Sequence, residues 1–169
     1  MVPASDALVF ATLCAGLGTG AVIDVKHRRI PNVVCLLMAV AGVGFAATGV
    51  SRITLAYSAM GLVLALLLML PGHIFGATGA GDVKFFAAAG ALLGAGRVLP
   101  AFLFMAIAGG VFAVGIAWRR GRLAQTVQRT AQLCGRDADA KAAIESQAAN
   151  NRFPYGPAIA VGSLLAALM

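Results

Sequence analysis

An unbroken run without a single Asp, Glu, Lys or Arg, from Ile53 to Gly81, constrains this chain more than any other feature. A second charge-free run, from Ala7 to Ile23, is shorter. About 20 apolar residues are enough for a helix to cross the hydrocarbon core of a bilayer. Of the 169 residues, 60% are hydrophobic and only 11% are charged, which is too little charge to cover a water-exposed surface. The sequence therefore predicts an all-α, polytopic membrane protein.

Charged and turn-forming residues divide the chain into about six apolar segments. Five of these predicted spans are 7–23, 33–50, 53–70, 83–96 and 98–118, and the sixth ends at Met169. We expect the third span to stop at Pro71, and Asp82 to cap the short fourth helix. We predict a single membrane domain over residues 1–169, with one long basic loop at 119–152.

The basic residues predict which side of the membrane each connection faces. If the segments alternate sides, the predicted cytoplasmic side holds eleven basic residues, which are Lys26, Arg28, Arg29, Lys84 and seven in the loop 119–152. The opposite side holds only Arg52 and Arg97. This asymmetry follows the positive-inside rule and predicts that both termini lie outside. The net charge of +7 thus reflects topology and contact with lipid headgroups, and no nucleic-acid partner is expected.

Two acids lie where apolar runs end, and they are the candidate catalytic residues. Asp24 follows the run 7–23, and Asp82 follows the charge-free run that begins at Ile53. Two carboxylates held close together cannot both ionise, so one keeps a proton while the other activates a water molecule. The alternative interpretation is that Asp82 only caps a helix and Asp24 only marks the membrane boundary. Their separation along the sequence does not determine their distance in space.

Residues beside the two acids are predicted to support the site. Gly79 and Gly81 allow close approach of the backbone. Lys26 and Lys84 are candidates to lower the pKa of a neighbouring carboxylate, or else to anchor the helices at the interface. No cofactor and no metal are expected, because no histidine or cysteine pair has ligand spacing. The three cysteines are scattered through the sequence, at Cys14, Cys35 and Cys134.

Three segments carry a resemblance to a known family. Residues 79–84 read Gly-Ala-Gly-Asp-Val-Lys, residues 24–32 read Asp-Val-Lys-His-Arg-Arg-Ile-Pro-Asn, and residues 153–160 read Phe-Pro-Tyr-Gly-Pro-Ala-Ile-Ala. Together they resemble the signatures of the type IV prepilin peptidases. The chain is most similar to the short form found in tight-adherence (Flp) pilus systems. It lacks the paired Cys-x-x-Cys motifs of the larger members, and Thr78 stands where those members usually have Met.

The resemblance implies an aspartic endopeptidase in the bacterial inner membrane, with Asp24 and Asp82 as its catalytic pair at the cytoplasmic side. Its substrate would be a prepilin or pseudopilin, from which it removes a short leader ahead of an apolar helix. Without the cysteine motifs, methyltransferase activity is not expected. Two alternatives remain at this point. One is a small transporter that uses the two acids to carry ions, and the other is a non-catalytic scaffold for pilus assembly.

Overall fold

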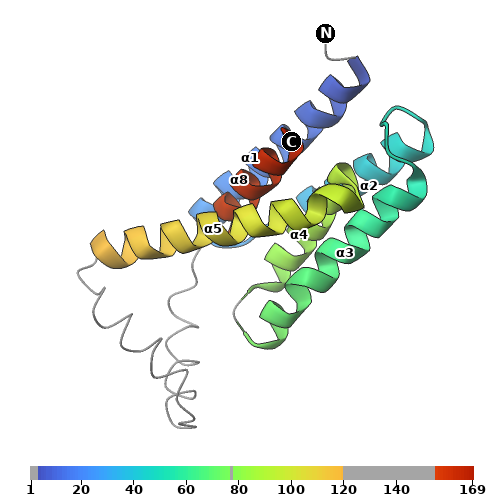
Figure 1. Cartoon of the computed structure of the whole chain (residues 1–169). Coiled ribbons are helices and arrows are strands. Elements are labelled where there is room, and N and C mark those ends of the chain that lie inside the picture. The colour runs from blue at the N-terminus through green and yellow to red at the C-terminus, as the bar shows by residue number, and fades with distance from the viewer. Residues whose placement is uncertain (1–3, 77, 120–154) are drawn as a thin grey trace. The chain divides into compact units, whose positions relative to one another are not determined.

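A computed structural model describes residues 4–76, 78–119 and 155–169 of the chain, and every regular element in these ranges is an α-helix. The elements shown in Figure 1 are α1 (Ala4–His27), α2 (Asn32–Ala47), α3 (Leu55–Ile74), α4 (Ala80–Leu93), α5 (Ala95–Arg119) and α8 (Gly156–Ala167). The prediction of an all-α protein is confirmed for this part of the chain. From residue 120 onward, the predicted basic loop lies outside the described residues, as does Cys134.

The chain divides into two compact units, one formed by Met1–Ala108 with Pro154–Met169 and the other by Gly109–Phe153. Both candidate catalytic acids belong to the first unit. There, α8 packs along α1, while α4 packs against both α2 and α3 (Figure 1). The described part of the second unit is the helical continuation of α5 from Gly109 to Arg119.

Three of the described helices are long and apolar enough to cross a membrane: Asp6–His27, Leu55–Ile74 and Ala95–Gly115. Two further apolar helices, Asn32–Ala47 and Gly156–Ala167, are shorter than 18 residues. The fourth predicted span corresponds to α4, which has 14 residues and thus a length of about 21 Å. The count of six spans, and the side on which the termini lie, stay predictions.

The outward faces of the helices are strongly apolar. Along α2, large hydrophobic side chains are more than 60% exposed at Val33, Leu36, Leu37 and Val40. Met60 on α3 is 58% exposed. An apolar surface of this extent is unfavourable in water and is satisfied by lipid tails. Together with the long apolar helices, it marks an integral membrane protein.

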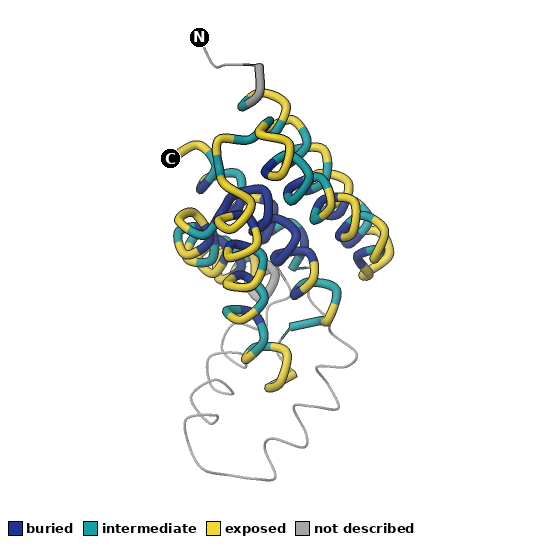
Figure 2. Tube along the Cα trace, turned by 90° about the vertical axis from the view of Figure 1, so that its right-hand side faces the viewer, coloured by how far each residue is buried: buried dark blue, intermediate teal, exposed yellow. Residues whose placement is uncertain are grey.

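Helix α4 forms the centre of the first unit. All of its residues from Phe85 to Leu93 are buried, and buried residues gather in the interior of the bundle in Figure 2. Small residues allow this close packing, because a Cβ atom built on Gly42 of α2 would lie 2.8 Å from the carbonyl carbon of Ala91. On another side of α4, the ring of Phe86 lies 6.2 Å from that of Phe102 on α5. The helix is thus surrounded by protein along most of its length.

The structure corrects four predicted boundaries. Helix α1 does not end before Asp24 but continues to His27, and Arg28 then ends it in a left-handed conformation with φ of 52°. Helix α3 does not stop at Pro71. Proline removes only its own N–H from the hydrogen-bond ladder, while the carbonyl of Pro71 still accepts from the N–H of Phe75 at 3.0 Å, so the helix continues to Ile74.

The other two corrections concern the start and the end of α4. The helix begins at Ala80, ahead of the predicted start at Val83, and Gly79 is its N-cap. Asp82 is therefore not the N-cap residue but the third residue of the helix, and its side chain caps the helix from there by accepting from the N–H of Gly79. The predicted end at Gly96 is also too late, because Gly94 takes a φ of 74° directly after Leu93 and separates α4 from α5.

Candidate active site

Helices α1 and α4 run in opposite directions, and two contacts between neighbouring segments define their register. A Cβ atom built on Gly20 of α1 would lie 2.5 Å from Cε2 of Phe85, so the Phe85 ring of α4 packs directly on this glycine. Beyond the end of α1, Ile30 lies against Gly81, with a built Cβ on Gly81 3.6 Å from Cβ of Ile30.

These two contacts bracket the candidate catalytic acids. Asp24 lies between Gly20 and Ile30 along one segment, and Asp82 lies between Gly81 and Phe85 along the other. Asp24 follows Gly20 by four positions and Asp82 precedes Phe85 by three, so each acid lies one turn from the contact and on the same helix face as its contacting residue. The two acids consequently lie at the same end of the bundle, on helices that touch.

Asp24 is almost completely buried, with 5% of its surface exposed. Its Oδ2 accepts a hydrogen bond of 2.8 Å from the backbone N–H of Gly156, the first residue of α8. Its main-chain carbonyl accepts another of 2.7 Å from the N–H of Arg28. A buried carboxylate needs such a donor, because burial without one is costly.

Asp82 is half-buried and is held by its own helix. Its Oδ2 accepts a hydrogen bond of 3.0 Å from the N–H of Gly79, while its own N–H donates to the Gly79 carbonyl at 3.1 Å. An acid in the first turn also interacts favourably with the positive end of the helix dipole. The helix-capping interpretation therefore describes a real contact of Asp82, and this contact is compatible with a catalytic role for the same carboxylate.

The two predicted glycines occupy different places around Asp82. Gly79 is the N-cap of α4, and a built Cβ there would lie 3.1 Å from Oδ2 of Asp82. Gly81 is the second residue of the helix and faces Ile30, at ordinary van der Waals distance. Gly79 thus approaches the acid itself, whereas Gly81 brings the segment after α1 close to α4.

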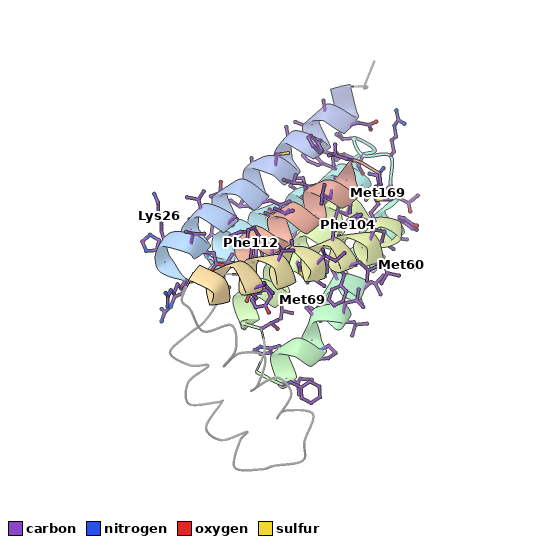
Figure 3. The ribbon with its side chains drawn as sticks, turned by 60° about the vertical axis from the view of Figure 1, so that its left-hand side comes forward. Lys26, Met60, Met69, Phe104, Phe112 and Met169 are labelled. Carbon is purple, nitrogen blue, oxygen red and sulfur yellow. The ribbon has the colours of Figure 1, made fainter. Side chains whose placement is uncertain are left out.

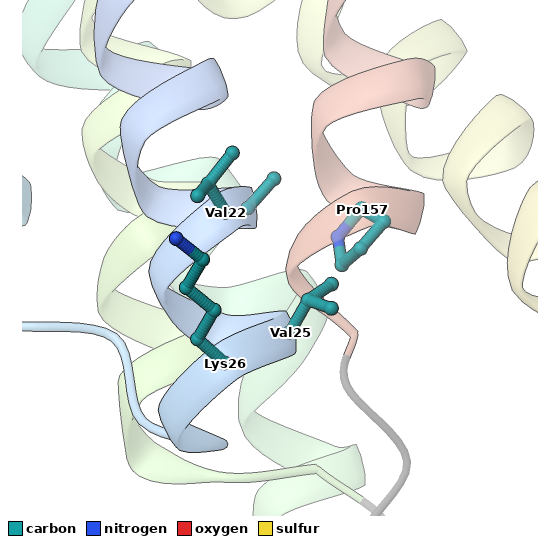
Figure 4. A pocket seen from close by; sticks show the side chains of 5 residues that line it. Val22, Val25, Lys26 and Pro157 are labelled. Atoms are coloured by element: carbon teal, nitrogen blue, oxygen red, sulfur yellow. The ribbon is translucent and has the colours of Figure 1, made fainter.

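The two predicted lysines lie at the same end of the bundle but are exposed. Lys26 projects outward from the last turn of α1 (Figure 3). It lines an open groove of about 250 Å³ between α1 and α8, otherwise formed by apolar residues (Figure 4), which are Ala21, Val22, Val25 and Pro157. Lys84 extends to Asn32, with 3.4 Å between Nζ and Oδ1. This exposed contact links the start of α2 to the second turn of α4.

The two ends of the bundle differ in their charged side chains. Besides Lys26 and Lys84, the exposed residues His27, Arg28 and Arg29 lie at the end that carries the two acids. At the opposite end of α1, Asp6 forms an ion pair of 3.1 Å with Arg52. The end with the two acids is thus the more basic one among the described residues.

The chemistry available here is that of two carboxyl groups at the edge of an apolar bundle. Within the described ranges, no group of three His, Cys, Asp or Glu residues is arranged to hold a metal ion. Two carboxyl groups on neighbouring helices are suited to general acid–base catalysis. The fold and the site together define a helical integral membrane protein with two acids at one end of the bundle.

Comparison with known protein families shows to which family of membrane proteins the chain belongs. The family model described as "Type IV leader peptidase family" matches residues 11–114, which is more than half of the chain, and the chain belongs to this family. The matched region contains both acids and helices α2 to α4. Comparison with curated proteins and with solved structures gives no match. The family resemblance noted in the sequence is confirmed, and the protein is a leader-peptidase-type protease.

Gly156 was not predicted from the sequence as a residue of this site. It lies 132 residues after Asp24, and no periodicity or spacing links the two. The only signal was its place in the third family-like segment, 153–160. Phe85 and Gly20 were also missed, because each reads as an ordinary apolar or small residue of a membrane helix.

Proposed function

We propose that this protein is an intramembrane aspartic endopeptidase that removes the leader from type IV or Flp-type prepilins or pseudopilins. Membership of the leader peptidase family supports the reaction class. The observation that carries the assignment of residues is the pair of contacts that brackets Asp24 and Asp82 at one end of two touching helices.

In the proposed reaction, the two acids share one proton and act on one water molecule. The ionised carboxylate takes a proton from the water as its oxygen attacks the scissile carbonyl carbon, and the protonated carboxyl gives its proton to the carbonyl oxygen. When the tetrahedral intermediate collapses, the C–N bond breaks and the leaving amine receives a proton from the first acid. The second acid recovers its proton from the hydroxyl of the intermediate as the carbonyl re-forms, so the site turns over without a cofactor.

The proposed location of the site is the cytoplasmic face of the bacterial inner membrane. Basic residues mark cytoplasmic connections, and in this protein they gather at the end that carries the two acids. A prepilin whose apolar helix lies in the bilayer would present the bond at the start of that helix to this face. We further propose six membrane-crossing segments with both termini outside, in which α4 is shielded from lipid by its neighbours.

The direct test is leader removal by Asp24→Asn and Asp82→Asn variants, co-expressed with a candidate prepilin and followed by gel mobility. Asparagine keeps the size and polarity of the side chain but cannot ionise, so each variant should lose at least about 1,000-fold in cleavage rate. Asp6→Asn is the matched control, since it makes the same chemical change on α1 at the opposite end of the bundle. Normal cleavage by either site variant would refute the proposal.

A further inference from the structure

We infer that α8, through the backbone N–H of Gly156, is a positioning element for the catalytic carboxylate of Asp24. The inference rests on the proposed function. It assigns a role in the active site to a segment outside the matched region 11–114, which ends well before Gly156. The bond from Gly156 N–H to Oδ2 of Asp24 is 2.8 Å long, buried, and joins residues from distant parts of the sequence.

Position 156 requires glycine because a side chain has no room there, and not because of the backbone conformation. Its φ is not among the positive values in the described chain, which belong to Arg28, Gly49, Gly76 and Gly94. A Cβ atom built on Gly156 would lie 2.9 Å from both Cβ and Oδ2 of Asp24, a separation that real Cβ atoms essentially never show. Any side chain at position 156 must therefore displace the carboxylate or the helix that carries it.

The helix start also supplies the electrostatic environment of the carboxylate. The first N–H groups of a helix have no partner within the helix, and they carry the positive end of its dipole. Tyr155 occupies the N-cap without capping the helix through its side chain. The N–H of Gly156 donates instead to Oδ2 of Asp24 on α1. The same hydrogen bond therefore caps α8 and orients the carboxylate of Asp24.

Helix α8 is well suited to hold a side chain in place because it is itself firmly packed. Its residues Ala158, Ile159 and Ala160 are buried, and it lies along α1. Farther along, Gly162 meets α5 so closely that a built Cβ would lie 2.7 Å from the carbonyl oxygen of Ala101. A rigid element places a catalytic group more reliably than a loop does.

The first test compares Gly156→Ala with Gly162→Ala in the same helix. Both add one methyl group at a site without room, but only the first touches Asp24. We expect kcat per folded molecule to fall about 100-fold in Gly156→Ala with little change in KM, the size of effect that a displacement of about 1 Å can cause. Gly162→Ala should lower the amount of folded protein and leave kcat near the wild-type value. Equal kcat losses in the two variants, or none in Gly156→Ala, would overturn the inference.

The second test observes the hydrogen bond without relying on activity or on a variant at position 156. Tyr155-Gly156 is the only Tyr-Gly step in the sequence, so labelling with carbonyl-13C tyrosine and 15N glycine yields a single amide signal for Gly156. Its proton resonance should move upfield in Asp24→Ala, which lacks the acceptor, and stay in place in Asp82→Ala. An unchanged resonance in Asp24→Ala would show that the contact does not form.

The outcomes separate the inference from the function on which it rests. If Asp24→Asn cleaves prepilin normally, the proposed function fails whatever Gly156 does. If Asp24→Asn is inactive while Gly156→Ala has a normal kcat, the peptidase assignment stands and the positioning role of α8 is wrong.

Discussion

The two acids of this protein are held in opposite ways. Asp82 is fixed by its own chain, through the N–H of Gly79 three positions earlier. Asp24 is fixed by α8, through a residue 132 positions later in the sequence. The first arrangement forms as soon as one helical turn forms, whereas the second exists only when α1 and α8 have packed together. The hydrogen bond that holds Asp24 is therefore complete only in the folded bundle.

Lengthening each acid by one methylene should separate the two kinds of support most clearly. Asp24→Glu has no room beside Gly156, so we expect a loss of about 1–3 kcal/mol in the free energy of unfolding. Asp82→Glu should change stability by less than about 0.5 kcal/mol, because glutamate at the third position of a helix still reaches the N-cap N–H. If both acids are catalytic as proposed, both variants should lose about 100-fold in turnover, since each substitution moves a carboxylate oxygen.

Thermal unfolding in detergent and the cleavage assay measure the two effects separately. Equal stability losses in Asp24→Glu and Asp82→Glu would contradict the distinction between local and long-range support.

A smaller effect is expected from the contact that sets the register of the two helices. Gly20→Ala would push the Phe85 ring, and with it the first turn of α4, away from α1. We expect turnover to fall about 10-fold, because the distance between the acids grows while each keeps its own hydrogen bond. Gly18→Ala is the matched control in α1, since a built Cβ there meets nothing within 4 Å.

Initial rates of prepilin cleavage, normalised to folded enzyme, give this measurement. A Gly18→Ala variant as impaired as Gly20→Ala would point to a general effect on α1 and against a role for the Phe85 contact.

The smallest effect should follow from Gly79→Ala. Its φ of −75° suits any residue, and a built Cβ lies 3.1 Å from the end of the Asp82 side chain, which can shift by a few tenths of an ångström. We expect a loss of at most about 1 kcal/mol in stability and a few-fold in turnover, measured by the same unfolding and cleavage assays. If this variant were as inactive as Gly156→Ala, the support of Asp82 would be no more tolerant than that of Asp24. Gly44→Ala on α2, where a built Cβ meets open space, serves as its control.

The sequence was informative wherever structure depends on neighbours along the chain. Charge-free runs predicted helices in a membrane, and the glycines before Asp82 predicted a tight approach at the start of a helix. Proline predicted the end of a helix less well, because Pro71 removes only one hydrogen bond near the end of α3 and the helix continues past it. The charged residues from Asp24 onward predict too early an end for α1, because charge does not prevent Val25 to His27 from continuing the helix.

The part of the site that could not be predicted depends on packing between distant segments. Nothing in the sequence says that Gly20 lies under Phe85 or that Gly156 meets Asp24. Glycine has many uses in membrane helices, and only the three-dimensional neighbours of a given glycine show which use applies. The family resemblance pointed to both acids, while the structure supplied their surroundings.

The burial of α4 has a consequence for how the protein responds to its membrane. Helices in contact with lipid adjust their tilt when the hydrocarbon thickness changes. Helix α4 is enclosed by other helices along most of its length, so its vertical position follows theirs and does not respond separately to the acyl chains. We therefore expect the depth of Asp82 relative to Asp24 to change little when the bilayer thickens or thins.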